Sequence, residues 1–286
     1  MADDAINHEP FSFLQLNARA RTECPLTLNF VNLNGEESDM GRWSALELLG
    51  GLVMGMAASL ATAAEGFIET FDALHPDGWH VANYEFSHPH FDTDWSQDQV
   101  HLSNGAHLYL SPKSTGTNRF AGASLRRETP THFGRYEVVM QPAQGEGIIT
   151  GFFTYTGDYY GTRHDEIDIE FLGKDTTRLH AAWFVNGQLT NHFIDLGFDA
   201  ADKPRLYAFE WLPDRIRWFA GDQVIFEVTE HEATLPSVPS FLFANIWAAD
   251  PSLETWSGTP NLDTHASAFI GAIRFIPMAD MRDLTS

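Results

Sequence analysis

Three acidic residues, Glu166, Asp168 and Glu170, alternate with apolar residues in one short stretch of the chain. The residues between and after them are Ile167, Ile169 and Phe171. Successive side chains of a β-strand point to opposite faces, so the acids would share one face and the apolar residues the other. The apolar face can enter a core, whereas a row of like charges on a strand is unfavourable and requires a functional reason.

Paired carboxylates that face a groove can cleave glycosidic bonds. A retaining enzyme uses one carboxylate as nucleophile and one carboxylic acid as proton donor, with the carboxyl groups about 5–5.5 Å apart. Glu166 and Glu170 would be roughly 13 Å apart at Cα on a strand, and their long side chains can close much of that gap. Asp168 lies between them and would couple their titrations. The alternative interpretation is an acidic, solvent-exposed face of an edge strand.

The composition is that of a globular protein with enough apolar residues for one substantial core, with 43% hydrophobic residues among 286. The formal net charge of −22 disfavours nucleic acid and anionic lipid surfaces as partners. A neutral partner such as a sugar fits better, although net acidity can also serve solubility alone. Cys24 is the single cysteine, which excludes an intramolecular disulfide and zinc sites built on cysteine pairs.

An uncharged apolar run of 13 residues occupies positions 48–60. It is too short to span a membrane and is typical of the hydrophobic part of a signal peptide. Arg42 precedes the run and small residues follow at 61–64. We therefore predict an upstream extension over 1–39, a signal peptide over 40–64, and a secreted or periplasmic catalytic domain over 65–286. A buried amphipathic helix is the alternative for the apolar run.

From residue 65 onward the pattern is one of short strands and tight turns, with almost no helical periodicity. The pairs Asn104-Gly105, Asn186-Gly187 and Gly221-Asp222 are typical of hairpin turns. Many strands at short spacing predict an all-β domain, either a sandwich of two sheets or a barrel. The predicted strands cover residues 107–110, 135–140, 148–155, 166–171, 178–184, 206–211, 215–219, 224–228, 241–247 and 268–276.

The run Glu166-Ile167-Asp168-Ile169-Glu170 matches the E-x-D-x-E signature of glycoside hydrolase family 16, and the chain resembles that family. The resemblance is strongest to the bacterial lichenases, which are endo-β-1,3-1,4-glucanases, and to related exopolysaccharide-processing endoglucanases. It extends from about residue 95 to residue 275. Similar segments lie at residues 134–138, 151–157, 165–177, 195–200 and 245–247.

The resemblance implies a β-jelly-roll, a sandwich of two curved antiparallel sheets with an open substrate cleft across its concave face. It assigns Glu166 as nucleophile, Glu170 as general acid/base and Asp168 as the supporting carboxylate. The implied reaction is retaining hydrolysis of internal bonds in a β-1,3/1,4-linked glucan or a related bacterial exopolysaccharide. Transglycosylation on the same glycans is one alternative, and a non-catalytic carbohydrate-binding jelly roll is another. A structural cell-envelope protein is a third, supported only by the acidic surface.

The resemblance also predicts which side chains line the cleft. Aromatic rings suit a glucan because the C–H groups on sugar faces pack against them, while core packing is the alternative for any single aromatic residue. The predicted substrate-binding residues are Trp95, Arg126, Phe153, Tyr155, His164, His180, Phe184, Asn245, Trp247 and Trp256.

Several positions depart from the lichenase pattern while the catalytic triplet is intact. This combination predicts an altered linkage or glycan preference. The changed positions, with the usual residue in brackets, are Asp92 (asparagine), Ser124 (glutamate), His164 (tryptophan), His180 (glutamine), Ala182 (asparagine) and Phe184 (tyrosine).

Other departures concern the scaffold. Thr93 and Gly122 stand where the subgroup has the two cysteines of a disulfide, so that bridge is absent. Gly271 replaces the aspartate associated with a structural calcium site, and we predict no cofactor and no metal. Residues 88–94 alternate metal-binding side chains, but we interpret them as a loop that enters the cleft. The expected partner is a polysaccharide, and we expect a monomer with no membrane attachment after signal removal.

Overall fold

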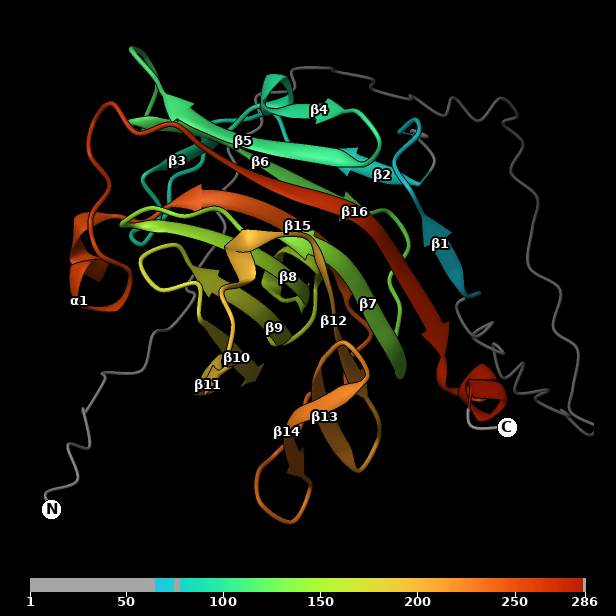
Figure 1. Ribbon diagram of the computed structural model, residues 1–286. Coiled ribbons are helices and arrows are strands. Elements are labelled where there is room, and N and C mark those ends of the chain that lie inside the picture. Colours follow the sequence, from blue (N-terminus) through green and yellow to red (C-terminus); the bar gives the residue numbers. More distant parts are fainter. Residues whose placement is uncertain (1–64, 75–77, 285–286) are drawn as a thin grey trace, which may run out of the picture. The chain divides into compact units, whose positions relative to one another are not determined.

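The computed structural model describes residues 65–74 and 78–284, and β-strands dominate its regular structure. The predicted upstream extension and signal peptide lie outside the described residues. The strands form two antiparallel layers, which are joined where β5 (Ala106–Pro112) pairs with β6 (Phe120–Arg127). Figure 1 shows one layer with β15 (Phe241–Ala248), β8 (Ile148–Thr156), β9 (Asp165–Leu172), β10 (Arg178–Val185) and β11 (Gln188–Asp195). The other layer contains the long β16 (Ala266–Pro277) with β7 (Gly134–Gln141) and β12 (Arg205–Trp211). This two-sheet sandwich is the predicted fold class.

The first sheet contains the acidic stretch as β9, with β8 and β10 on its two sides. A short strand, β2, also pairs with β6. In spatial order the sheet consists of β11 (Gln188–Asp195), β10 (Arg178–Val185), β9 (Asp165–Leu172), β8 (Ile148–Thr156), β15 (Phe241–Ala248), β6 and β2 (Trp79–Val81).

The second sheet covers the other side of the core. Its spatial order is β4 (Val100–Leu102), β5, β16 (Ala266–Pro277), β7 (Gly134–Gln141), β12 (Arg205–Trp211), β13 (Arg215–Ala220) and β14 (Gln223–Thr229), with β1 (Phe67–Glu69) on β16. The remaining elements are β3 (Thr93–Trp95), α1 (Glu254–Ser257) and the 3-10 turns Gln97–Gln99, Asp158–Tyr160, Ala200–Asp202, Pro251–Leu253 and Met278–Leu284.

One face of each sheet is apolar, and the two apolar faces form a shared core. Aromatic rings meet across the layers: the ring centroids of Phe171 and Tyr207 are 5.0 Å apart, and those of Trp183 and Trp218 are 5.8 Å apart. Full burial of one such side chain stabilises the fold by about 1.5–3 kcal/mol. The core therefore fixes which face of each first-sheet strand points away from the second sheet.

The predicted turns are confirmed by backbone geometry. Asn104 and Asn186 have φ values of 53° and 50°, and Gly221 has φ of 59°. Asparagine and glycine adopt this left-handed region more readily than other residues, which is why such pairs close tight hairpins. All ten predicted strands lie within strands of the structure, while β6, β11 and the short strands β1 to β4 were missed by the sequence reasoning.

Thr93 stands at one of the two positions where the lichenase subgroup has cysteine. Its Oγ1 donates to the carbonyl oxygen of Ala248 at 3.1 Å and accepts the backbone N–H of Ala248 at 2.7 Å. β3, which contains Thr93, also pairs in parallel with β6 next to Gly122. Backbone pairing between β3 and β6 therefore connects the segments that the disulfide would join, and the threonine hydroxyl ties β3 to β15 as well.

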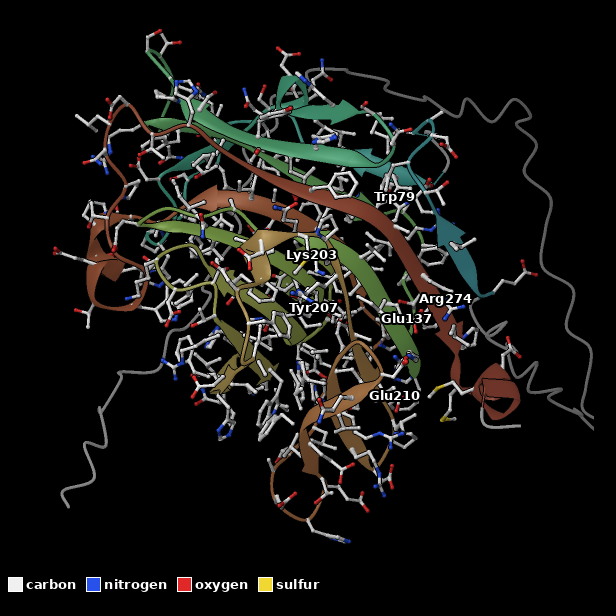
Figure 2. The ribbon with its side chains drawn as sticks, viewed as in Figure 1. Trp79, Glu137, Lys203, Tyr207, Glu210 and Arg274 are labelled. Atoms are coloured by element: carbon white, nitrogen blue, oxygen red, sulfur yellow. The ribbon has the colours of Figure 1, made fainter. Side chains whose placement is uncertain are left out.

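The outer face of the second sheet has a chain of ion pairs across four strands. Arg135 donates to Glu137 at 2.7 Å and to Glu210 at 3.0 Å. Arg274 donates to the second oxygen of Glu137 at 2.6 Å, and Arg217 to that of Glu210 at 2.8 Å. Figure 2 shows Glu137 and Arg274 side by side on β7 and β16. Each carboxylate thus accepts from two guanidinium groups.

These contacts shift the titration of Glu137. Burial alone would raise the pKa of Glu137, but hydrogen bonds and charge from Arg274 and Arg135 outweigh it and hold the pKa below its ordinary value of 4.5. A depressed pKa in the folded state means that the stability gained from this group is present above pH 4.5. It is lost as the pH falls through the folded-state value.

We expect Glu137→Gln to lower the free energy of unfolding at pH 7 by about 2 kcal/mol, because it leaves charged guanidinium groups with a weaker acceptor. Solvent screening keeps this loss of unfolding free energy modest, since the Arg274 side chain is 44% exposed. The difference between the variant and the parent should shrink as the pH falls below 4.5. Urea unfolding at pH 7, 5 and 3.5 measures this, and a difference that grows toward acid pH would contradict the analysis.

Candidate active site

β9 is an interior strand of the first sheet, so the interpretation of its acids as an exposed edge-strand face is wrong. Ile167 and Ile169 are fully buried in the core between the sheets. Strand alternation then turns Glu166, Asp168 and Glu170 to the opposite face of the sheet. The predicted grouping of the three carboxylates on one face is confirmed.

The three carboxylates line a single pocket on that face. In the register of the sheet, Phe184 and His180 of β10 lie opposite Glu166 and Glu170. Further lining comes from β11, β15 and two loops. The complete set is His90, Glu166, Asp168, Glu170, His180, Ala182, Phe184, Leu189, Asn191, Phe193, Trp247, Leu253 and Trp256.

Asp168 is the central carboxylate and is buried. Burial is the main cause that raises the pKa of Asp168 well above its ordinary value, and the charges of Glu166 and Glu170 and a hydrogen bond with Glu166 add to it. Trp218 of the second sheet donates its indole N–H to the backbone carbonyl of Asp168 at 2.9 Å. The protonated form of Asp168 is therefore favoured next to Glu166, on a strand that is tied to the opposite layer.

Glu166 has a histidine partner. The Nε2 atom of His164 lies 2.5 Å from Oε2 of Glu166, and both side chains are about nine-tenths buried. The imidazole ring stacks on Phe184 at a centroid distance of 4.7 Å and meets the edge of Tyr155 at 5.1 Å. His164 was predicted to bind substrate, and the structure places it against the carboxylate itself.

Glu170 also has a histidine partner, which is His180. The Nδ1 atom of His180 lies 3.0 Å from Oε2 of Glu170. The ring of His180 is 4.5 Å from Phe193 and 5.7 Å from Trp256, measured between centroids. Sequence reasoning found both histidines as departures from a family pattern but did not find these pairings, because they depend on the register between β9 and β10.

Aromatic side chains of β8 and β15 lie beside the acids on the cleft face. Phe153, opposite Asp168 in the register, stacks on Phe243 at 5.1 Å, and both rings are partly exposed. Further along β15, Trp247 stacks on Phe91 at 4.1 Å and lies 6.1 Å from Trp256. Partly exposed rings next to the acids suit the C–H faces of sugar rings.

Six predicted binding residues lie outside the pocket lining: Phe153, Tyr155 and His164 of the groups above, together with Trp95, Arg126 and Asn245. Trp95 is buried in the aromatic cluster that contains Phe91, so it supports Trp247 from behind. Arg126 donates to the hydroxyl of Tyr160 at 3.1 Å and to a carboxylate oxygen of Glu128 at 2.8 Å. Asn245 is buried on the cleft face, where its Oδ1 has no hydrogen-bond partner among the described residues.

Sequence reasoning missed the contribution of β11, which supplies Leu189, Asn191 and Phe193 to the pocket. Most residues of this strand are exposed, and it lacks the alternation of apolar and polar residues that identifies a strand. The turn at Asn186-Gly187 was the available signal, because a hairpin turn after one strand predicts a partner strand.

The loop at residues 88–94 enters the cleft as predicted, since His90 lines the pocket. Burial and the neighbouring His90 lower the pKa of His88 to about 4, so His88 is neutral at physiological pH.

No group of three or more His, Cys, Asp or Glu side chains within 65–74 and 78–284 is arranged to hold a metal ion. In the same part of the chain, no helix has the length and hydropathy to cross a membrane.

Comparisons with known proteins agree with this geometry. The model of glycosyl hydrolases family 16 matches residues 87–265. The beta-glucanase of Brevibacillus brevis is 36% identical over 216 residues, which are 74% of this chain and 82% of that protein. The solved Bacillus licheniformis beta-glucanase is 33% identical with a TM-score of 0.69, covering 74% of this chain and 98% of that one. A lichenase from a mouse hindgut metagenome is 30% identical with a TM-score of 0.71, covering 74% and 99%.

The matched residues include the three carboxylates, most of both sheets and the aromatic cleft. The chain therefore belongs to glycosyl hydrolases family 16 and is a glycoside hydrolase of the beta-glucanase type with a jelly-roll fold.

Proposed function

We propose that the chain is a retaining endo-β-glucanase that cleaves internal bonds of a β-1,3/1,4-linked glucan or a related bacterial exopolysaccharide. The observation that carries the proposal is the placement of Glu166 and Glu170 in one pocket, on one face of an interior strand, with Asp168 between them. The beta-glucanase relatives support the substrate class. We also propose a secreted or periplasmic monomer that needs no cofactor.

In the first step, a carboxylate oxygen of Glu166 attacks the anomeric carbon and Glu170 donates a proton to the leaving glycosidic oxygen. The C–O bond to the leaving sugar breaks as the glycosyl–enzyme bond forms. Because Oε2 of Glu166 accepts from His164, we assign the other oxygen as the attacking atom. In the second step, Glu170 removes a proton from water, which attacks the same carbon and releases Glu166. Two inversions give net retention.

Asp168 supports Glu166 as a neutral neighbour. A protonated Asp168 can donate to Glu166 and stabilise its carboxylate without adding a third negative charge to the pocket. When Glu166 becomes an ester, it loses its charge and holds that hydrogen bond less strongly. Asp168 thus assists the departure of Glu166 in the second step, in which the carboxylate is released.

The first test is a product analysis. The protein is incubated with lichenan, barley β-glucan, laminarin, carboxymethylcellulose and an acidic exopolysaccharide, and the products are measured by mass. Internal cleavage of one or more of these glycans is expected, with a β-anomer as the first product in NMR spectra. Products longer than the starting chains would indicate transglycosylation, and binding without cleavage would indicate a carbohydrate-binding domain.

We expect Glu166→Gln to lower kcat/KM on the preferred glucan by a factor of about 100 or more, because the amide cannot form the glycosyl–enzyme bond. Affinity for the glucan should persist, since the aromatic cleft is unchanged. Glu230→Gln is the matched control, because Glu230 is exposed in the turn after β14. Undiminished kcat/KM in Glu166→Gln would exclude Glu166 as the nucleophile.

Asp168→Asn should stabilise the fold increasingly as the pH rises. The pKa of Asp168 is raised in the folded state, so the stability that this group contributes is present at acid pH and is lost as the pH rises from its ordinary value of 3.8 toward the raised value. An asparagine is neutral throughout and lacks this loss. Urea unfolding of the variant and the parent from pH 4 to pH 8 tests the prediction. If the difference in free energy of unfolding between Asp168→Asn and the parent stays constant or reverses with rising pH, Asp168 is ionised in the native protein.

A further inference from the structure

We propose that His180 is a positioning residue that decides which oxygen of Glu170 carries the catalytic proton. The inference rests on the proposed function, in which Glu170 is the general acid/base. It gives His180 a role toward the acid Glu170 in addition to the contact with sugar that the family resemblance predicted.

The position of His180 is tightly defined. It lies directly opposite Glu170 in the β9–β10 register, and its Nδ1 is 3.0 Å from Oε2 of Glu170. The ring is 4% exposed and is confined by Phe193 and Trp256, whose centroids are 4.5 Å and 5.7 Å away. Packing on two sides restrains the imidazole from turning away from the carboxyl group.

The contact has a consequence for the location of the proton. If Oε2 carried the proton of the acid, that O–H would point toward Nδ1 and not toward the glycosidic oxygen. If Nδ1 carries hydrogen, it donates to Oε2 and leaves the acidic proton on Oε1. After Oε1 has given up its proton, the same N–H stabilises the carboxylate, which then accepts a proton from water at Oε1.

The surroundings of Nε2, the other nitrogen of the His180 ring, favour a hydrogen on Nδ1. The Nε2 atom of His180 is buried and has no hydrogen-bond partner among the residues that the structure describes, and His180 lines the same pocket as the acids. A hydroxyl of a bound sugar can donate to Nε2, and a neutral imidazole that accepts at Nε2 must carry its hydrogen at Nδ1. Substrate binding therefore stabilises the tautomer that places the proton of Glu170 on Oε1.

His180→Asn and His180→Leu form a matched pair for testing this role. The two side chains have nearly the same shape, and both lose the imidazole ring, but only asparagine can donate an N–H to Oε2. The substrates are the preferred glucan and a 2,4-dinitrophenyl β-glycoside of its oligosaccharide product. Dinitrophenolate leaves without protonation, so kcat/KM on this substrate does not depend on a placed proton. Glu170→Gln, which lacks the catalytic acid, provides the reference values of kcat/KM on the two substrates.

On the glucan, we expect kcat/KM of His180→Leu to be at least about tenfold below that of His180→Asn, as misplacement of a reacting group predicts. On the dinitrophenyl glycoside the two variants should agree within about threefold, which also shows that both are folded. His192→Asn is the control, because His192 is exposed on β11 and lies opposite Ala181, on the other face of the sheet. It should match the parent on both substrates.

Equal kcat/KM of His180→Asn and His180→Leu on the glucan would overturn the role of His180. The same ratio of kcat/KM between the two variants on the glucan and on the dinitrophenyl glycoside would overturn it as well. Either result in an active parent would leave the glucanase proposal standing. A parent enzyme that cleaves neither substrate would overturn the proposed function and, with it, this inference.

Discussion

The active site depends on the two-residue period of one interior strand. Because Ile167 and Ile169 are held in a core between two sheets, β9 cannot slip by one residue without burying its carboxylates and exposing its apolar residues. Core packing thereby forces three acidic groups onto one face at short range. Burial and the charges of Glu166 and Glu170 raise the pKa of Asp168, which favours its neutral form and reduces the electrostatic cost of that proximity. The Trp218 indole from the opposite sheet holds the strand at this point.

The acids on the two outer faces of the sandwich have different partners. Glu137 and Glu210 of the second sheet accept from arginines, which stay protonated at all relevant pH values and so remain charged donors. Glu166 and Glu170 contact imidazoles, which can donate or accept a hydrogen according to tautomer. A guanidinium partner suits a structural carboxylate, whereas an imidazole partner suits a group whose charge must change during a reaction.

Alternation and turn chemistry made much of this structure predictable. Strands with a clear apolar face, such as β9, were found together with the carboxylates that they position. β11 was missed because its side chains are mostly exposed, and β6 because small residues such as Gly122 and Ser124 blur its pattern. The pairing of His180 with Glu170 follows from a register between strands, and a single sequence does not specify a register that loops and core packing determine together.

The contacts of Thr93 have a consequence for how the protein matures. In the lichenase pattern, a cystine covers the position that Thr93 and Gly122 occupy, so folding there is coupled to an oxidant. In this chain strand pairing joins the segments of Thr93 and Gly122, the threonine hydroxyl fastens β3 to β15, and Cys24 is the only thiol in the sequence. The sandwich can therefore reach its native state without a disulfide-forming step, and its thermal stability should not depend on the redox potential of the medium.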